Sequence, residues 1–152
     1  MGSRIVVTGG GTGIGRAIAA ALLPQASQVV LVGRRLEVLR EAAQDLGTMA
    51  PTGVQVTPLA CDLTVPHEVE KLAELLHRGP SIDVLVCNAG GNVGVGAGPD
   101  LASIAEVWRG DFDANVLSAV LLTSAVLDHV TRPGGRIIAM SSIAALRGSG
   151  SY

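Results

Sequence analysis

A glycine-rich segment near the amino terminus has the residue types and spacing that could hold a diphosphate. Residues 8–15 read TGGGTGIG, follow a β-branched run at residues 5–7, and precede an apolar helical pattern. A turn close to a diphosphate leaves no room for Cβ atoms, and the free N–H groups that start the next helix face its charge. A glycine cluster alone could be an ordinary turn, but the order strand, glycine turn, helix favours a dinucleotide site. The candidate binding residues are Gly9, Gly11, Thr12, Gly13, Ile14 and Gly15.

Two arginines after the second predicted strand bear on the choice of cofactor. NAD sites often carry an acidic residue at this point for the ribose 2′-hydroxyl, whereas this chain has Gly33 followed by Arg34 and Arg35. A guanidinium can bind a 2′-phosphate bidentately, and we therefore favour NADP over NAD. The other interpretation is that both arginines are solvated residues at the start of a helix, where they would lie unfavourably against the helix dipole.

Further candidate site residues, several of them polar, stand at the ends of other predicted strands and inside one predicted helix. Those at strand ends are Asp62 and Leu63 after the third strand, Asn88, Ala89 and Gly90 after the fourth, and Ser142 after the fifth. Taken singly, Asp62 could be an acidic residue at a helix N-terminus, and Asn88 could be a turn residue. Asn115 falls inside a predicted helix, where asparagine is a poor residue and needs a local reason.

A regular alternation of strand and helix patterns positions these residues. Strands are predicted near residues 4–8, 28–33, 54–60, 82–87 and 135–141, and helices near 13–23, 35–46, 66–78 and 102–131, the last broken near Gly110. The strands are continuously apolar where helices are expected to cover both faces. This predicts an α/β fold with a Rossmann-like, doubly wound parallel sheet in the strand order 3-2-1-4-5, as one domain over residues 1–152.

The composition of the chain limits the kinds of binding partner that we expect. The chain has 152 residues, 48% of them hydrophobic, and a net charge of −2, which gives no electrostatic reason to expect nucleic acid or an anionic membrane. Its uninterrupted apolar runs fall short of the ~18 residues of a membrane span, and the first predicted strand leaves no room for a signal peptide. We therefore expect a cytoplasmic protein. The histidines lack metal-ligand spacing, so we expect them on solvated helix faces and expect no metal.

Together these motifs resemble the short-chain dehydrogenase/reductase family over essentially the whole chain. Many Rossmann proteins share the glycine pattern, but its combination with Asn-Ala-Gly at residues 88–90 and paired serines at residues 141–142 is specific. The resemblance implies that the glycine turn binds the pyrophosphate, that Asp62 and a neighbouring N–H lie beside the adenine, and that residues 88–90 shape the wall near the ribose. It also implies that Asn115 holds a water in a proton relay and that Ser142 orients the substrate oxygen.

The family's catalysis depends on a tyrosine followed four residues later by a lysine. The resemblance implies that Tyr152, ten residues after Ser142 and somewhat closer than is usual, is this tyrosine. Its hydroxyl would pass a proton to or from the substrate oxygen, and the lysine would lower its pKa. The sequence ends at Tyr152, so the lysine has no counterpart here. We therefore expect residues 1–152 alone to be at most a weak nucleotide binder without turnover, and to need a C-terminal complementing fragment.

The function implied is an NADP-dependent oxidoreductase that interconverts a carbonyl and a secondary alcohol on a small molecule, 3-oxoacyl reductase-like or acting on a related ketone. The alternatives are a dinucleotide-binding module without turnover and a structural or interaction subunit. The last alternative rests on residues 116–127, which are apolar nearly all round. We expect a partner subunit or a further part of the chain to cover this face, giving a homo-oligomer through the 102–131 helix.

Overall fold

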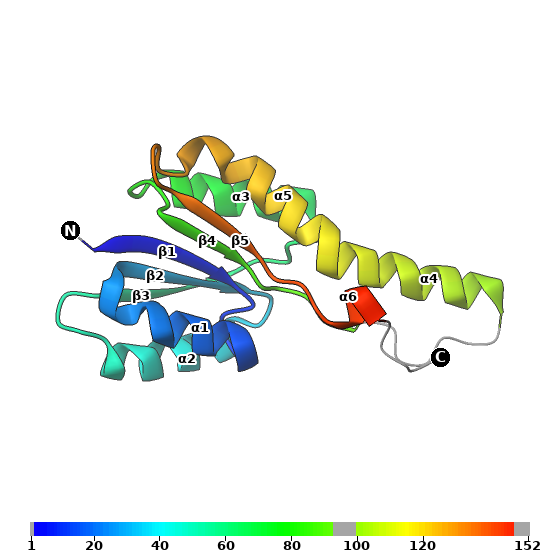
Figure 1. Ribbon diagram of the computed structural model, residues 1–152, viewed down its shortest axis with the longest axis horizontal. Helices are drawn as coiled ribbons and strands as arrows, with labels where there is room; N and C mark the ends of the chain where they lie inside the picture. Colours follow the sequence, from blue (N-terminus) through cyan, green and yellow to red (C-terminus); the bar gives the residue numbers. More distant parts are fainter. Residues whose placement is uncertain (1, 93–99, 148–152) are drawn as a thin grey trace.

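The computed structural model describes residues 2–92 and 100–147, with strands and helices alternating along both ranges (Figure 1). The strands are β1 (Ser3–Thr8), β2 (Ala26–Gly33), β3 (Gln55–Ala60), β4 (Val84–Cys87) and β5 (Arg136–Ala139). The helices are α1 (Gly13–Leu22), α2 (Leu36–Met49), α3 (Pro66–His77), α4 (Leu101–Phe112), α5 (Ser118–Val126) and α6 (Ala144–Arg147). Short 3-10 turns, η1 (Leu23–Gln25) and η3 (Leu127–His129), follow α1 and α5, and a π-helical segment, η2 (Asp113–Leu117), joins α4 to α5.

The strands form one parallel sheet in the order β3-β2-β1-β4-β5, which confirms the predicted order. β1 is central, and its Val6 pairs with Val30 of β2 and Leu85 of β4. All three side chains are almost fully buried, as expected for strands covered on both faces. The strand order reverses between β1 and β4. The carboxyl ends of these two strands therefore flank the position where open α/β sheets bind ligands.

Helices cover both faces of the sheet and produce two separate cores (Figure 1). On one face, α1 and α2 pack against Val7 of β1, with Leu39 and Leu46 of α2 in the centre. On the other face, α3 and α5 pack against Val6, with Leu122 of α5 fully buried. Val6 and Val7 belong to different cores because successive strand residues point to opposite faces.

Two details of local structure differ from the sequence predictions. The long helix runs without a break through Gly110, and its irregularity is instead η2, which contains Asn115. The side chain of Asn115 donates Nδ2 to the carbonyl oxygen of Asp111 at 2.8 Å, and this competition for a helix carbonyl accompanies the wider π-helical turn. β4 and β5 are shorter than predicted, because their ladder extends only from the pair Val84–Arg136 to the pair Cys87–Ala139.

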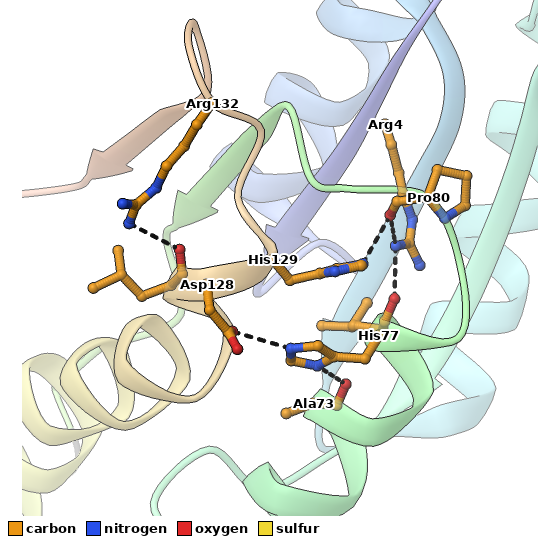
Figure 2. A network of polar contacts seen from close by, with 9 residues as sticks. Arg4, Ala73, His77, Pro80, Asp128, His129 and Arg132 are labelled. Atoms are coloured by element: carbon orange, nitrogen blue, oxygen red, sulfur yellow. Dashed lines mark hydrogen bonds and ion pairs between the residues drawn. The ribbon is translucent and has the colours of Figure 1, made fainter.

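A polar network closes the opposite edge of the sheet, where the strands begin (Figure 2). Arg4 is only 5% exposed and donates hydrogen bonds to Gln28 and to the carbonyl oxygens of Leu76 and Pro80. The rings of His77 and His129 lie 4.5 Å apart, and His77 Nε2 is 3.1 Å from Oδ1 of Asp128. The sequence-based expectation of histidines on solvated helix faces does not include these contacts, because they join residues distant in the sequence that meet where α3 and η3 end.

The stretch Leu101–His129 is one long helical element with an apolar surface. The exposed large apolar side chains along it are Leu101, Ile104, Trp108, Phe112, Val116, Val120 and Leu127. An 18-residue segment within the stretch has a mean hydropathy of 1.3, so by length and composition alone the helix is long and apolar enough to cross a membrane. Uninterrupted apolar runs do not reveal this because single polar residues break them. Only 17% of that 18-residue segment is buried among the described residues, so the helix presents an uncovered apolar face. A single such helix does not distinguish a membrane span from a surface that another protein segment covers.

Candidate functional site

A cleft of about 540 Å³ lies at the carboxyl ends of β1, β2, β3 and β4. Its volume is within the range of roughly 300–1,000 Å³ that is typical of ligand sites. The residues that sequence analysis assigned to cofactor binding all line it: Gly9, Gly11, Thr12, Gly13, Ile14, Gly15, Arg34, Arg35, Asp62, Leu63, Asn88, Ala89 and Gly90. They come from four separate strand ends, and the parallel sheet brings them to one edge.

The glycine turn between β1 and α1 meets two different steric demands. A Cβ on Gly15 would collide with the carbonyl oxygen of Gly9 and lie 2.5 Å from Nδ2 of Asn88, so close packing of α1 on the sheet requires glycine there. Gly13 has a φ of +51°, yet a Cβ on it would meet no protein atom within 4 Å. The start of α1 therefore faces open space in the cleft. Open space in front of unpaired helix N–H groups is a cradle that a phosphate fits.

Thr8, the last residue of β1, fastens this turn to the end of β4. Its buried Oγ1 donates to the carbonyl oxygen of Val86 at 3.2 Å and accepts the N–H groups of Asn88 and Ala89 at 2.9 and 2.8 Å. In return, Nδ2 of Asn88 donates to the carbonyl oxygen of Thr8 at 3.0 Å. These hydrogen bonds hold together the two strand ends that flank the switch point. Asn88 is therefore more than the turn residue that it could be when taken singly, because it also joins the end of β4 to the end of β1.

Asp62 lies on the wall of the cleft, in the loop between β3 and α3. Its Oδ1 accepts the hydroxyl of Thr64 at 2.7 Å and the N–H of Thr64 at 3.0 Å, and its own N–H donates to Oε2 of Glu68 at 2.7 Å. The Thr64 hydroxyl, with the Thr64 N–H and the nearby charge of Arg34, holds the pKa of Asp62 below its ordinary value against an opposing effect of burial. Asp62 is therefore ionised at neutral pH and acts only as a hydrogen-bond acceptor.

Arg34 and Arg35 line the same cleft at the end of β2. Both are exposed, and Arg35 directly precedes the first turn of α2. Within residues 2–92 and 100–147, neither guanidinium forms an ion pair with a carboxylate. They share the cleft with Gly11 and Thr12, so their charge is available to an anionic group bound between the glycine turn and β2.

A sequence model of the short chain dehydrogenase family matches residues 3–152. The chain belongs to this family. It is 33% identical over 141 residues to the human (Homo sapiens) dehydrogenase/reductase SDR family member 2, mitochondrial, covering 92% of this chain and 49% of that protein. It is 34% identical over 154 residues to sorbitol dehydrogenase from Cereibacter sphaeroides, covering 97% of this chain and 55% of that protein.

Solved structures of the short-chain dehydrogenase family share the fold. L-sorbose reductase from Gluconobacter frateurii, crystallised with NADPH and L-sorbose, superposes with a TM-score of 0.81 and 30% identity over 97% of this chain and 55% of that chain. A short-chain dehydrogenase/reductase from Mycobacterium ulcerans gives a TM-score of 0.79 and 30% identity over 94% and 52% of the two chains. The chain thus spans about half the length of the curated relatives it matches.

The three residues that the family resemblance assigned to catalysis differ in their position relative to the cleft. Asn115 lies in η2 and is hydrogen-bonded to Gly91, which lines the cleft. A Cβ on Gly90 would lie 2.5 Å from Oδ1 of Asn115, so the glycine allows this close approach. Ser142 follows β5 and is exposed, but it does not line the cleft. Tyr152 lies outside the described residues.

Sequence reasoning missed three residues that support the cleft. The glycine motif begins with Thr8, but the motif alone does not indicate that a buried hydroxyl at the end of a strand needs a hydrogen-bond partner. Thr64 stands two residues after Asp62, which is the spacing of an Asx-turn. Glu68 stands at the third position of α3, where a glutamate can reach back to an N–H before the helix. The last two signals are visible in the sequence.

Proposed function

We propose that the protein is an NADP-dependent oxidoreductase that interconverts a carbonyl and a secondary alcohol. The single observation that carries this proposal is the cleft, where the glycine turn, Arg34, Asp62 and residues 88–90 surround one space in a chain of the short-chain dehydrogenase family. The open cradle before α1 fits the pyrophosphate of a dinucleotide.

The choice of NADP over NAD rests on charge at the end of β2. Gly33, Arg34 and Arg35 line the cleft, and no carboxylate stands among them to accept a ribose 2′-hydroxyl. A 2′-phosphate there would meet a guanidinium instead of a repelling carboxylate. NADPH is present in the structure of the related L-sorbose reductase, which supports the same class of cofactor for this chain.

Within the proposed site each residue has a separate task. The glycine turn binds the pyrophosphate, Asp62 and the N–H of Leu63 contact the adenine, and Asn88-Ala89-Gly90 form the wall beside the ribose. NADPH, when bound, supplies a hydride for the carbonyl carbon. Tyr152 gives its hydroxyl proton to the substrate oxygen, Ser142 orients that oxygen, and Asn115 holds a water that connects the tyrosine to solvent.

The substrate is proposed as a small ketone or its alcohol. Two relatives act, by their names, on sorbitol and L-sorbose, which favours a polyhydroxylated ketone, whereas a 3-oxoacyl thioester is the other candidate of this class. The test is turnover by the intact protein with NADPH, followed at the nicotinamide absorbance, with L-sorbose and a 3-oxoacyl thioester as parallel substrates. Binding of NADPH without turnover of any ketone would favour the alternative of a non-catalytic dinucleotide-binding module.

The proposed partners are a second copy of the chain and a C-terminal complementing fragment. The apolar face of α4 and α5 is exposed, and β5 is an exposed edge strand with Ile137 and Ile138 about 40% accessible. An uncovered apolar edge strand favours pairing with further protein. Residues 1–152 alone should bind NADPH weakly and show no reductase activity, and adding the complementing fragment should restore turnover. Full turnover by residues 1–152 alone would contradict the assignment of the catalytic residues.

A further inference from the structure

The two carboxylate oxygens of Asp62 have different surroundings. Oδ1 accepts both donors of Thr64, the N–H at 3.0 Å and the hydroxyl at 2.7 Å. Among residues 2–92 and 100–147, no donor forms a hydrogen bond with Oδ2. Because two bonds from one neighbour fix Oδ1, rotation of the carboxylate is restricted and Oδ2 keeps one direction. Asp62 and Thr64 both line the cleft, so this fixed carboxylate belongs to its wall.

Glu68 holds the backbone of the same residue from the other side. Its Oε2 accepts the N–H of Asp62 at 2.7 Å, from the first turn of α3. The Glu68 side chain is half-buried, and α3 is anchored in the core through Val69, the next residue, which is 2% exposed. The contact therefore ties the loop that carries Asp62 to a rigid helix. Side chain and backbone of Asp62 are each fixed by a different residue.

The position of Asp62 determines which bases this wall can accept. An ionised carboxylate accepts hydrogen bonds and cannot donate them. The 6-amino group of adenine is a donor, whereas the 6-oxo group of hypoxanthine or guanine is an acceptor and would face Oδ2 with like partial charge. A site built to bond one polar group rejects an analogue that lacks it, provided that the site cannot rearrange. Fixing Oδ2 in advance thus adds discrimination as well as affinity.

We propose that Thr64 and Glu68 are positioning residues that hold Asp62 so that its Oδ2 selects a 6-aminopurine over a 6-oxopurine in the bound dinucleotide. This inference rests on the proposed function, because it assumes that a dinucleotide binds with its base beside Asp62. It adds two residues that contact no substrate themselves. Their effect is on the choice of base and not on the hydride transfer.

The matched probes are NADPH and its analogue with hypoxanthine in place of adenine, which differ only at the base. Their dissociation constants for the intact protein are measured by the fluorescence of the reduced nicotinamide. The unmodified protein should bind NADPH about 10-fold or more tightly than the hypoxanthine analogue, the effect expected for a hydrogen bond to a charged group. In steady-state kinetics the difference should appear in KM for the cofactor, with kcat similar for the two.

The variants separate positioning from folding. Thr64→Val removes the hydroxyl donor at nearly constant volume, Thr64→Ser restores it, and Glu68→Ala removes the acceptor for the Asp62 N–H. Glu70→Ala is the control, since Glu70 is an exposed carboxylate on the same helix. Thr64→Val and Glu68→Ala should reduce the preference for adenine several-fold, mainly by weakening NADPH, whereas Thr64→Ser and Glu70→Ala should keep it. Thermal unfolding of each variant confirms that it is folded.

The outcomes distinguish this inference from the proposed function. If Thr64→Val and Glu68→Ala weaken both dinucleotides equally, the two residues are only structural and the inference is wrong, while the proposed function stands. If the unmodified protein binds both dinucleotides equally well, Asp62 does not select the base and the inference is again wrong. If neither dinucleotide binds, the proposed function fails and takes the inference with it.

Discussion

The side chain of Asn115 forms a reciprocal pair of hydrogen bonds with the backbone of Gly91. Nδ2 donates to the Gly91 carbonyl oxygen at 2.7 Å, and the Gly91 N–H donates to Oδ1 at 2.9 Å. A further bond from Nδ2 to the carbonyl oxygen of Asp111 connects the pair to the end of α4. One side chain thus joins the loop after β4, which lines the cleft, to the π-helical turn η2.

Replacing Asn115 should therefore damage catalysis more than folding. Asn115→Leu removes all of these hydrogen bonds, including the two that attach Gly91 to η2. The bonds are solvent-exposed, so we expect a loss of about 1 kcal/mol in unfolding free energy. Misplacement of the loop and of the water proposed to lie there should lower kcat about 10²-fold. The two quantities are measured by urea denaturation and by NADPH oxidation with a ketone. A variant with normal kcat would show that Asn115 has no part in the reaction.

Thr8 should contribute to stability through the groups it satisfies. Thr8→Val keeps the shape of the side chain but leaves the partly buried N–H of Ala89 without its acceptor, while the N–H of Asn88 keeps only the carbonyl oxygen of Val86 at 3.1 Å. One such unsatisfied group costs about 1–3 kcal/mol, so we expect a loss of about 2 kcal/mol in the free energy of unfolding. Thr8→Ser retains the hydroxyl and serves as the control, with a loss of about 1 kcal/mol for the buried methyl group. Equal losses in both variants would mean that packing, and not hydrogen bonding, is the role of Thr8.

The topology and the cleft could be predicted from the sequence because they depend on patterns that are local. Continuous apolar runs such as Val29–Val32 indicate buried strands, and parallel strands place all their carboxyl ends at one edge. Every cofactor residue proposed from a strand end therefore lies on the same cleft. The roles of these residues stay predictions.

The parts that could not be predicted depend on contacts between distant residues. Arg4 and Pro80, or Thr8 and Ala89, are joined by hydrogen bonds across more than 70 positions of sequence. The predicted place of the helix irregularity, Gly110, is also wrong, because the side chain of Asn115 competes for a helix carbonyl and the glycine does not break the helix. Helix propensities of single residues do not describe this competition, because it depends on the contact of Asn115 with Gly91 in the loop after β4.

Arg34 should determine the preference between the two nicotinamide dinucleotides. The unmodified protein is expected to bind NADPH more tightly than NADH, and Arg34→Asp should erase or reverse this preference. Loss of a charge-assisted contact to the 2′-phosphate costs about 1.5–3 kcal/mol, which is roughly 10- to 100-fold in affinity. Arg78→Asp makes the same change of charge at the far end of α3 and is the control. Identical titration curves for NADPH and NADH with the unmodified protein would refute the assignment.

The contact between His77 and Asp128 should make stability depend on pH in a defined window. Nδ1 of His77 faces the carbonyl oxygen of Ala73 at 2.7 Å and Nε2 faces Asp128 at 3.1 Å, so only the protonated ring can donate to both. The Ala73 carbonyl and then Asp128 accordingly raise the pKa of His77, and the hydrogen bond from His77 lowers the pKa of Asp128.

Because the pKa of His77 is raised in the folded state, its contribution to the free energy of unfolding is fully present below the unfolded pKa. This contribution is lost as pH rises through the folded pKa. For Asp128 the sign is opposite, and its contribution is lost as pH falls below about 4. The stabilising effect should therefore be greatest between about pH 4 and 6.5. We expect His77→Gln to destabilise the protein more at pH 5.5 than at pH 8.5, by a small amount because the pair is exposed. His67→Gln, at the start of the same helix, is the control, and a difference independent of pH would contradict the account.

The apolar face of α4 and α5 should mediate association of the intact protein. Of the apolar residues in α5, Leu122 and Val126 are fully buried against the sheet, while Val120 is 52% exposed on the other side. Val116 in η2 and Leu127 in η3 lie on the same exposed stretch, so one side of this helix has no cover among the described residues.

A charge placed on this face should weaken association without unfolding the monomer. Val116→Lys is expected to shift the sedimentation velocity of the intact protein toward a smaller species, because a lysine ammonium buried between two apolar surfaces would lose its hydration. Leu122→Lys is the contrasting variant, which should unfold the protein because residue 122 is in the core. Glu106→Lys, a change at an exposed polar position of α4, tests whether charge alone has an effect. If the unmodified protein sediments as a monomer at high concentration, the exposed face serves another partner.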